Sequence, residues 1–314
     1  MTKATAVLAI VLGATCVDAA AAPQTQTGGS TFSVVQSPEI PMKVNLCGKN
    51  IDLSRVDMYE RFDRELSSVA YTHGTTMLII KRANRLFPEI APILKANGIP
   101  EDFLYLVCCE SSLNPRAYSP AKAAGLWQFI APTAKQYGLE VNDEVDERYD
   151  LEKATAAACR YLKKAYAKYG DWPSVMASYN GGMTRVSKEL ESQGADTSLD
   201  LYLAEETTRY PYRIMALKTL MSTPKAYGFN LRDSQLYQPM KYRIVEVNGP
   251  VEDWPEWARK QGISYAQLKD ANPWIRAKKL TNKTGKTYKV RIPTEESLKR
   301  VTKGFKTYNP AWTR

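Results

Sequence analysis

A single carboxyl group stands apart from the other acidic residues of the chain. Glu110 ends the apolar segment FLYLVCCE, and the 29 residues that follow it, 111–139, contain no Asp or Glu. Partial burial at the end of so apolar a segment would raise the pKa of Glu110 and let it hold a proton near neutral pH. The residues after it are rich in Ser, Asn, Gln, Gly and aromatic side chains, a mixture suited to contacting sugars. Glu110 is therefore a candidate general acid, although composition alone favours an ion pair with Arg or a helix cap.

Other kinds of chemistry lack the residues that they require. His73 is the one histidine, and the five cysteines form no CxxC pair, so neither a zinc site nor a His-based nucleophile is expected. Neither GxGxxG nor GxxxxGK[ST] occurs, so no nucleotide-phosphate motif is present. We expect no metal and no cofactor, and a chemistry that rests on carboxylates, hydroxyls and amides.

Helical periodicity dominates the part of the chain that must position Glu110. The segment before Glu110 is apolar on every face, which predicts a buried, central helix. Pro88 separates two expected helices, Gly98 ends the second, and Asp150 caps a later one. No strand is expected before residue 230. The expected helices start near residue 54 and then cover 75–87, 88–97, 100–110, 151–169, 172–182 and 208–223.

The C-terminal part of the sequence has a different pattern, which predicts strands as well as helices. Residues 242–247 and 287–292 have β-branched and aromatic residues at strand spacing, and two short helical segments, 255–260 and 265–271, lie between them. Residues 241–314 contain 17 Lys and Arg but 7 Asp and Glu, an excess equal to the whole formal charge of +10. A neutral body with a basic module indicates an anionic polymer or surface as partner.

The first residues resemble a targeting segment rather than part of the fold. Lys3 precedes a short apolar run, and small residues at 19–22 offer a cleavage site, so residues 1–22 are expected to be a signal peptide. The run is too short to span a bilayer. The alternative is acylation of Cys16, which would make the chain an outer-membrane lipoprotein. Residues 23–53 are assigned to a flexible leader.

The remaining cysteines are interpreted as buried, small apolar residues. Cys108 and Cys109 are adjacent in the apolar segment before Glu110. Export would permit disulfides, and a Cys109–Cys159 bridge is the alternative. A thiol nucleophile is not expected, because no histidine stands near enough in a recognisable motif.

Four motifs, in order, resemble the soluble lytic transglycosylase (SLT) family. The agreement in spacing and order extends over residues 95–230, and the last motif is similar to the membrane-bound lytic murein transglycosylase D group within that family. The motifs are Glu110-Ser111 with Asn114-Pro115 to Ser119, then AGLWQF at 124–129, then ASYNGG at 177–182, and last EETTRY at 205–210. The chain departs from the family at Lys122, at Cys108-Cys109 and at Pro211, which puts the loop over the cleft and the surroundings of Glu110 in doubt.

The resemblance implies a lysozyme-like, mostly α-helical fold that cleaves peptidoglycan between N-acetylmuramic acid (MurNAc) and N-acetylglucosamine (GlcNAc). The family uses one Glu as acid and then as base, and leaves a 1,6-anhydro-MurNAc end without consuming water. Carried over to this sequence, Glu110 is the catalytic acid and base. The implied substrate-binding residues are Ser111, Ser119, Gln128, Tyr179, Asn180 and Glu206. Tyr179 and Asn180 have a structural alternative, in which they only close a helix onto the core.

The basic module resembles a LysM domain, a small βααβ fold that binds GlcNAc chains. Tyr242, Ile244, Leu268, Asn272-Pro273 and the closing 290–293 carry this resemblance, but Asn248-Gly249-Pro250 replaces the usual opening. The expected domains are thus a helical extension at 54–94, an SLT domain at 95–232, a LysM-like domain at 241–293 and a basic tail at 294–314. The tail is either an arm for peptide carboxylates or a solvated segment without specificity.

The expected function is that of an enzyme of the periplasm or cell envelope that acts on peptidoglycan glycan strands. One alternative is a hydrolytic muramidase on the same fold, which needs a second carboxylate such as Asp143, Asp146 or Glu206 to hold a water. Another alternative is a wall-binding protein without activity. Binding of nucleic acid is not expected, because the secretion signal argues against it.

Overall fold

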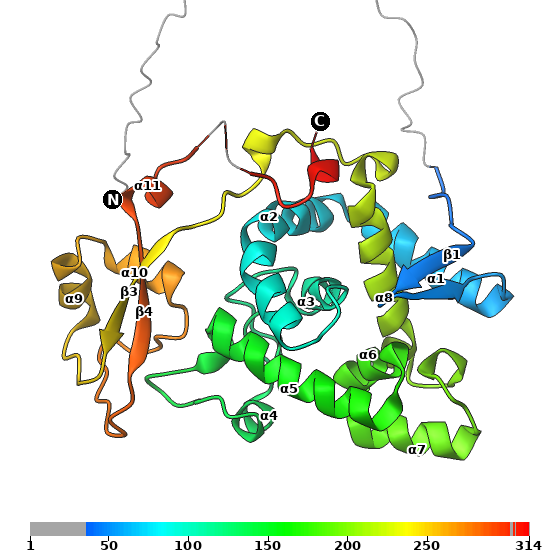
Figure 1. Cartoon of the computed structure of the whole chain (residues 1–314), viewed down its shortest axis with the longest axis horizontal. Helices are drawn as coiled ribbons and strands as arrows, with labels where there is room; N and C mark the ends of the chain where they lie inside the picture. Colours follow the sequence, from blue (N-terminus) through cyan, green and yellow to red (C-terminus); the bar gives the residue numbers. More distant parts are fainter. Residues whose placement is uncertain (1–35, 302–303, 305, 314) are drawn as a thin grey trace, which may run out of the picture. The chain divides into compact units, whose positions relative to one another are not determined.

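The computed structural model describes residues 36–301, 304 and 306–313, nearly all of which fall in one compact unit, Pro38–Arg314. The expected signal peptide, Cys16 and the first part of the leader lie outside the described residues. The chain is mostly helical, with two small two-stranded sheets (Figure 1). Within the described ranges, no helix combines the length and the apolar content that crossing a bilayer requires.

A β-hairpin opens the described part of the chain. Strand β1 (Lys43–Leu46) pairs antiparallel with β2 (Lys49–Asp52). The two residues of the turn, Cys47 and Gly48, both have positive φ, 52° and 84°, as a two-residue hairpin turn requires. The assignment of these residues to a flexible leader without strands was therefore wrong. Each strand has only four residues, too few to give a readable alternation, and the buried ones are Val44, Leu46 and Ile51.

Two long helices follow the hairpin. Helix α1 (Val56–Tyr71) and helix α2 (His73–Ala96) match the periodicity from residue 54, but α2 is continuous through Pro88 and Pro92. The expected break at Pro88 was wrong. A proline inside a helix costs about 3 kcal/mol, and burial of the apolar side chains on both sides of it, such as Phe87 and Ile90, offsets that cost. Gly98, with φ 67°, ends this segment as predicted.

The helix that carries Glu110 is central, as predicted. Helix α3 (Phe103–Ser111) buries side chains on all its faces and contacts both α2 and α8 (Glu205–Ser222), as Figure 1 shows. It ends where Ser112 and Leu113 take left-handed φ values of 50° and 55°. Helix α8 begins three residues earlier than expected and passes through Pro211.

Side-chain caps fix the first residues of two further helices. Asp150 accepts a hydrogen bond from the backbone N–H of Lys153 at 2.9 Å, and Asp171 accepts one from Ser174 at 3.0 Å. These caps open α5 (Leu151–Tyr169) and α6 (Trp172–Gly181), both as predicted. Helices α4 (Ala131–Gln136) and α7 (Met183–Gln193) were not predicted. Short 3₁₀ helices lie at Glu147–Tyr149, Ser198–Asp200, Pro224–Tyr227, Asp233–Gln235 and Pro310–Trp312.

The C-terminal module has the predicted βααβ order. Strand β3 (Tyr242–Val247) pairs antiparallel with β4 (Tyr288–Pro293), in the register Tyr242↔Pro293. Helices α9 (Trp254–Lys260) and α10 (Tyr265–Ala271) connect the strands, and α11 (Glu295–Leu298) follows them. The core of the module contains Val145 and Tyr149 from the helical body, so the module is completed by residues outside it.

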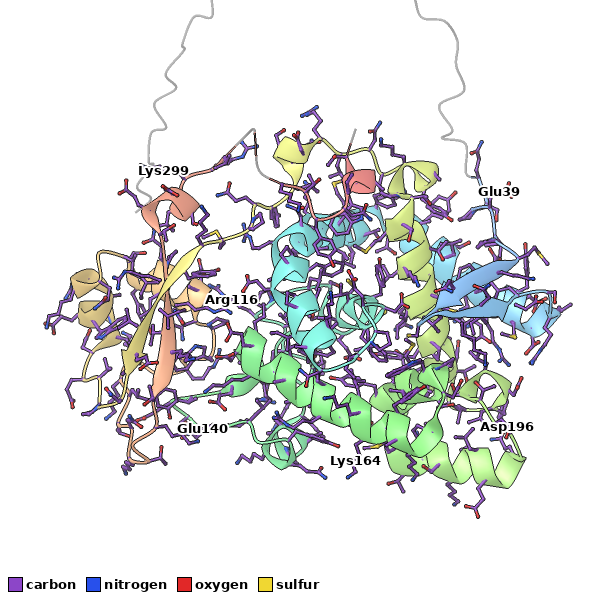
Figure 2. The ribbon with its side chains drawn as sticks, viewed as in Figure 1. Glu39, Arg116, Glu140, Lys164, Asp196 and Lys299 are labelled. Carbon is purple, nitrogen blue, oxygen red and sulfur yellow. The ribbon has the colours of Figure 1, made fainter. Side chains whose placement is uncertain are left out.

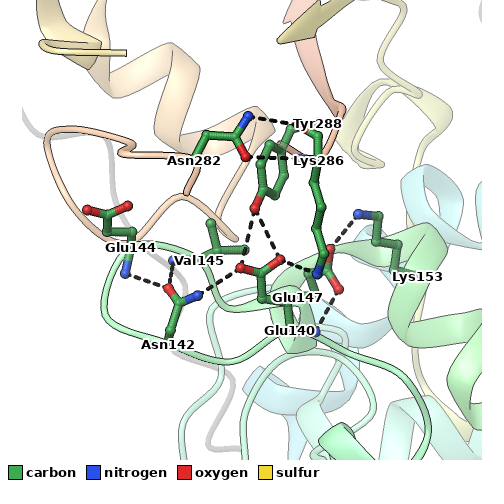
Figure 3. Close-up of polar contacts among 9 residues, drawn as sticks. All are labelled: Glu140, Asn142, Glu144, Val145, Glu147, Lys153, Asn282, Lys286 and Tyr288. Carbon is green, nitrogen blue, oxygen red and sulfur yellow. Dashed lines mark hydrogen bonds and ion pairs between the residues drawn. The ribbon is translucent and has the colours of Figure 1, made fainter. Parts of the chain in front are cut away.

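Charged contacts join the module to the helical body. Glu140 accepts hydrogen bonds from Lys286 Nζ at 2.8 Å and from the Tyr288 hydroxyl at 3.1 Å (Figure 3). Burial alone would raise the pKa of Glu140, but these bonds lower it below its usual value. Arg291 of β4 pairs with Glu89 at 2.6 Å and with Glu152 at 2.7 Å. The module is thus fixed on the body by strand β4 and by the loop that precedes it.

The last residues are not a free basic arm. Trp312 is 1% exposed, contacts Phe87 edge-on and donates from Nε1 to the carbonyl of Met221 at 2.8 Å. The backbone N–H of Tyr308 donates to Asn84 Oδ1 at 2.8 Å. The expectation of a carboxylate-binding arm or a solvated tail was wrong for this segment, because Trp312 is part of the main core and Tyr308 packs against that core.

Candidate active site

Glu110 lies in a cleft of about 650 Å³ in the helical body. The structure brings six of the seven predicted site residues to this cleft from α3, α6, α8 and the loop before α4. They are Glu110, Ser119, Gln128, Tyr179, Asn180 and Glu206. Ser111 does not line the cleft: its side chain is buried, and its hydroxyl donates to the carbonyl of Val107 in the same helix at 3.1 Å.

The environment of Glu110 favours its protonated form. Burial raises the pKa of the Glu110 carboxyl to about 7, and the nearby charge of Glu206 acts in the same direction. A hydrogen bond from the Tyr210 hydroxyl to Glu110 Oε1 and the positive charge of Arg213 oppose this shift. A carboxyl with a pKa near neutrality can both give and take a proton at the pH where the protein works.

Tyr210 and Arg213 line the cleft but were not among the predicted site residues. They follow Glu206 by four and seven positions on α8, which places all three on one face of that helix. Arg213 donates from Nη1 to Glu206 Oε1 at 3.0 Å. Their spacing from Glu206 is the signal that could have identified them.

A buried carboxylate holds Arg213 in place from the other side. Glu65 of α1 is 1% exposed and accepts hydrogen bonds from Arg213 Nε at 3.0 Å and from Arg209 Nε. Two cations thus neutralise one buried anion, which is the condition under which a buried charge is tolerated. No feature of the sequence near Glu65 indicates this pairing.

The loop that carries Gln128 approaches a neighbouring backbone closely. Gly125 has φ 76°, and a Cβ atom at this position would lie 1.9 Å from the carbonyl oxygen of Arg148, so only glycine fits there. Gln128 Nε2 donates to the carbonyl of Gly125 at 2.8 Å, which orients the amide. Arg148 Nη1 donates to the carbonyls of Lys122 and Phe129, at 2.8 and 3.1 Å, and so holds both ends of the loop.

Tyr179 and Asn180 have structural contacts as well as a place in the cleft. The Tyr179 hydroxyl donates to the carbonyl of Trp127 at 2.8 Å, and burial raises its pKa well above the usual value. Asn180 is exposed, and its Oδ1 accepts a hydrogen bond from the Thr207 hydroxyl at 2.9 Å. These bonds tie the end of α6 to the loop and to α8.

The candidate second carboxylates are not equally placed. Glu206 lines the cleft, with 60% of its side chain exposed and an ion pair to Arg213. Asp146 is buried in an ion pair with Arg148 at 2.7 Å, and neither it nor Asp143 lines the cleft. Of the lining residues, Glu110 and Glu206 are the two with carboxylates.

The described residues contain no cluster of three or more His, Cys, Asp or Glu that could hold a metal ion. The four described cysteines are free thiols, so the alternative Cys109–Cys159 bridge is absent from the structure. Burial raises the pKa of the Cys109 thiol well above its usual value, which suits an inert side chain and not a nucleophile.

Comparisons with known proteins identify two domains. Residues 87–200 match the family described as Transglycosylase SLT domain, and residues 243–296 match the Soluble lytic transglycosylase C-terminal LysM-like domain.

Membrane-bound lytic murein transglycosylase D of Escherichia coli, from strains K12 and O6:H1, is 30% identical over 226 residues in each case. The match covers 70% of this chain and 48% of the relative, so the chain spans about half the length of these curated relatives. Among solved structures, the 70 kDa soluble lytic transglycosylase of Escherichia coli is 22% identical, with a TM-score of 0.37, over 42% of this chain and 23% of that one.

Proposed function

We propose that this chain, which contains an SLT transglycosylase domain followed by a LysM-like domain, is a lytic transglycosylase of peptidoglycan. It cleaves the bond between MurNAc C1 and the O4 atom of GlcNAc, and closes a 1,6-anhydro ring on the MurNAc. The observation that supports this best is Glu110 itself, a buried carboxyl with its pKa raised to about 7 in a polar cleft.

Glu110 acts twice in the proposed reaction. Protonated, it gives its proton to the glycosidic oxygen as the C1–O4 bond breaks, so that GlcNAc leaves with a free 4-hydroxyl. As a carboxylate, it takes the proton of the MurNAc 6-hydroxyl while O6 bonds to C1. The protons balance, Glu110 returns to its starting state, and no water is consumed. A pKa near 7 suits both steps.

The other cleft residues hold the sugar and the acid in this proposal. Gln128, Ser119 and Asn180 present amide and hydroxyl groups to the glycan, and Tyr179 braces the loop of Gln128. Ser111 acts only from within α3, as part of the helix end that carries Glu110. Glu206 orients Arg213 toward the cleft.

A hydrolytic muramidase is the second candidate, because Glu206 lines the same cleft. In a hydrolase, a second carboxylate must activate a water or attack the sugar. The ion pair of Glu206 with Arg213 favours the transglycosylase, since a base engaged by a guanidinium is less available to take a proton from water.

The remaining assignments are part of the same proposal. The LysM-like module holds glycan strands, and the chain works in the periplasm or cell envelope. Residues 1–22 would direct export, and acylation of Cys16 would anchor the chain to the outer membrane. The word "membrane-bound" in the names of the two relatives is consistent with this location.

The mass of the products distinguishes the two activities. Digestion of purified sacculi by the transglycosylase should release muropeptides one water lighter than those that lysozyme releases. Glu206→Gln should alter the rate but leave the anhydro product unchanged. Products with reducing ends, lost in Glu206→Gln, would establish a hydrolase. Binding to sacculi without any release of products would leave a wall-binding protein.

The pH dependence should follow the protonation of Glu110. kcat/KM should fall as the pH rises through about 7, because the proton needed for the leaving oxygen is lost. Tyr210→Phe removes a hydrogen bond that lowers the pKa of Glu110, so this fall should move to higher pH. Tyr137→Phe is the matched control, since the buried Tyr137 hydroxyl has no hydrogen-bond partner. If kcat/KM of Tyr210→Phe falls at the same pH as that of the parent protein, a group other than Glu110 controls this fall.

A further inference from the structure

A second cavity, of about 640 Å³, lies between the SLT domain and the LysM-like module. Arg116 and Tyr118 line it from the loop that follows Glu110, whereas Ser119 of the same loop lines the cleft. Lys269 and Arg276 line it from the module. Figure 2 labels Arg116. The Arg116 guanidinium group pairs with the carboxylate of Asp270 in the module. The cavity therefore exists only because the module is docked on the body.

The lining of this basic cavity has more positive charge than its carboxylates can balance. Arg148 is paired with Asp146, and Arg116 with the exposed Asp270. Lys269 and Arg276 donate to the backbone carbonyls of Ile275 and Pro273, and within the described part of the chain neither has a carboxylate partner. Burial, and then the charges of Arg276 and Arg116, lower the pKa of Lys269 to about 8, as expected for a partly buried cation near other cations.

The basic cavity is within reach of a substituent on a glycan held in the cleft. Tyr118, Ala124 and Phe129 lie in three adjacent bridged segments, with Phe129 on the cleft and Tyr118 on the cavity. Neighbouring hydrogen-bonded segments lie about 5 Å apart, so the first and third of these segments are separated by about 10 Å. An extended peptide of four residues spans about 13 Å, so a stem peptide attached to a MurNAc in the cleft can cross the loop and place its carboxylates in the cavity.

We propose that the basic cavity binds the free carboxylates of peptidoglycan stem peptides, so that the chain selects strands whose MurNAc residues still have stems. This inference rests on the proposed function, because that function identifies peptidoglycan as the ligand. Its test measures binding and does not require the proposed activity. Arg276 supplies a guanidinium group and Lys269 an ammonium group, neither paired with a carboxylate of the described residues, and the side chain of Tyr118, 59% exposed, lies beside them to contact the peptide.

The test measures binding and needs no turnover. The ligands are the disaccharide GlcNAc–MurNAc with a tetrapeptide stem and the same disaccharide without it, neither of which contains the bond to be cleaved. Titration calorimetry should show that the stem tightens binding at least tenfold. Amidation of the stem carboxyls should remove that gain, and so should the double variant Lys269→Gln/Arg276→Gln. The gain should also shrink at high salt, as ion pairing requires.

The matched control is Lys278→Gln/Lys279→Gln, which removes two exposed charges from the same module outside the cavity and should keep the gain. Equal affinity for the two disaccharides, or an unchanged gain in Lys269→Gln/Arg276→Gln, would overturn the inference even if sacculi are digested. A stem-dependent gain without any digestion would instead support the cavity and overturn the proposed activity.

Discussion

Glu110→Gln should lower kcat on purified sacculi by about 10²–10⁴-fold, the range that a general acid and base contributes. Glutamine keeps the size of the side chain and can still accept the hydrogen bond from Tyr210, but it has no proton to give to the glycosidic oxygen. KM should change little, because Gln128, Ser119 and Asn180 are untouched. Single-turnover digestion with detection of anhydro products measures the effect.

Stability provides the control for this loss. The pKa of Glu110 is raised in the folded chain, so its contribution to stability is full below the pKa of the unfolded state and is lost as the pH rises through about 7. Glu110→Gln lacks this loss, so above pH 7 it should unfold at the same or a higher denaturant concentration than the parent protein. Glu191→Gln, on the exposed face of α7, should leave both activity and stability unchanged. Full activity in Glu110→Gln would exclude this residue as the acid.

Glu65→Gln should lower the free energy of unfolding by about 3–5 kcal/mol, the usual cost of removing one partner from a buried ion pair. The carboxylate is 1% exposed and neutralises Arg209 and Arg213 together. Without it, two guanidinium groups remain in a low-dielectric environment between α1 and α8. Urea unfolding followed by circular dichroism measures the change.

Glu60→Gln is the matched variant for this measurement. It makes the same chemical change five positions earlier on α1, but at an exposed side chain, and should shift the unfolding midpoint little. If Glu65→Gln were as stable as Glu60→Gln, the three-residue network would contribute nothing and Arg213 would be held by Glu206 alone.

Local patterns predicted most of the helical body. The uniformly apolar segment 103–110 predicted a central helix, and Asp150 predicted the first residue of α5. What the sequence did not reveal depends on distant contacts or on very short elements. The hairpin at 43–52 has too few residues for an alternating pattern, and Trp312 is buried against Phe87, 225 positions earlier in the chain.

The residues of the candidate site also fall into two groups: those that local motifs predicted and those that depend on distant contacts. Glu110 and Gln128 lie in neighbouring motifs of one short stretch, residues 110–129, so their types and order could be recognised without a structure. Arg213 reaches the cleft because Glu65, 148 positions earlier, holds it there. Tyr210 belongs to a recognised motif, but only the meeting of α3 and α8 shows that its hydroxyl reaches Glu110. A contact between helices that are far apart in the chain produces no local sequence pattern from which it could be predicted.

Arg148 holds a loop whose residues line both the cleft and the basic cavity. It bonds the loop carbonyls of Lys122 and Phe129, and its own carbonyl touches Gly125. If a ligand in the basic cavity shifts this loop, it changes the affinity of the cleft for glycan, and by linkage a glycan in the cleft then changes the affinity of the cavity by the same factor. The coupling free energy is the same whichever of the two sites is titrated.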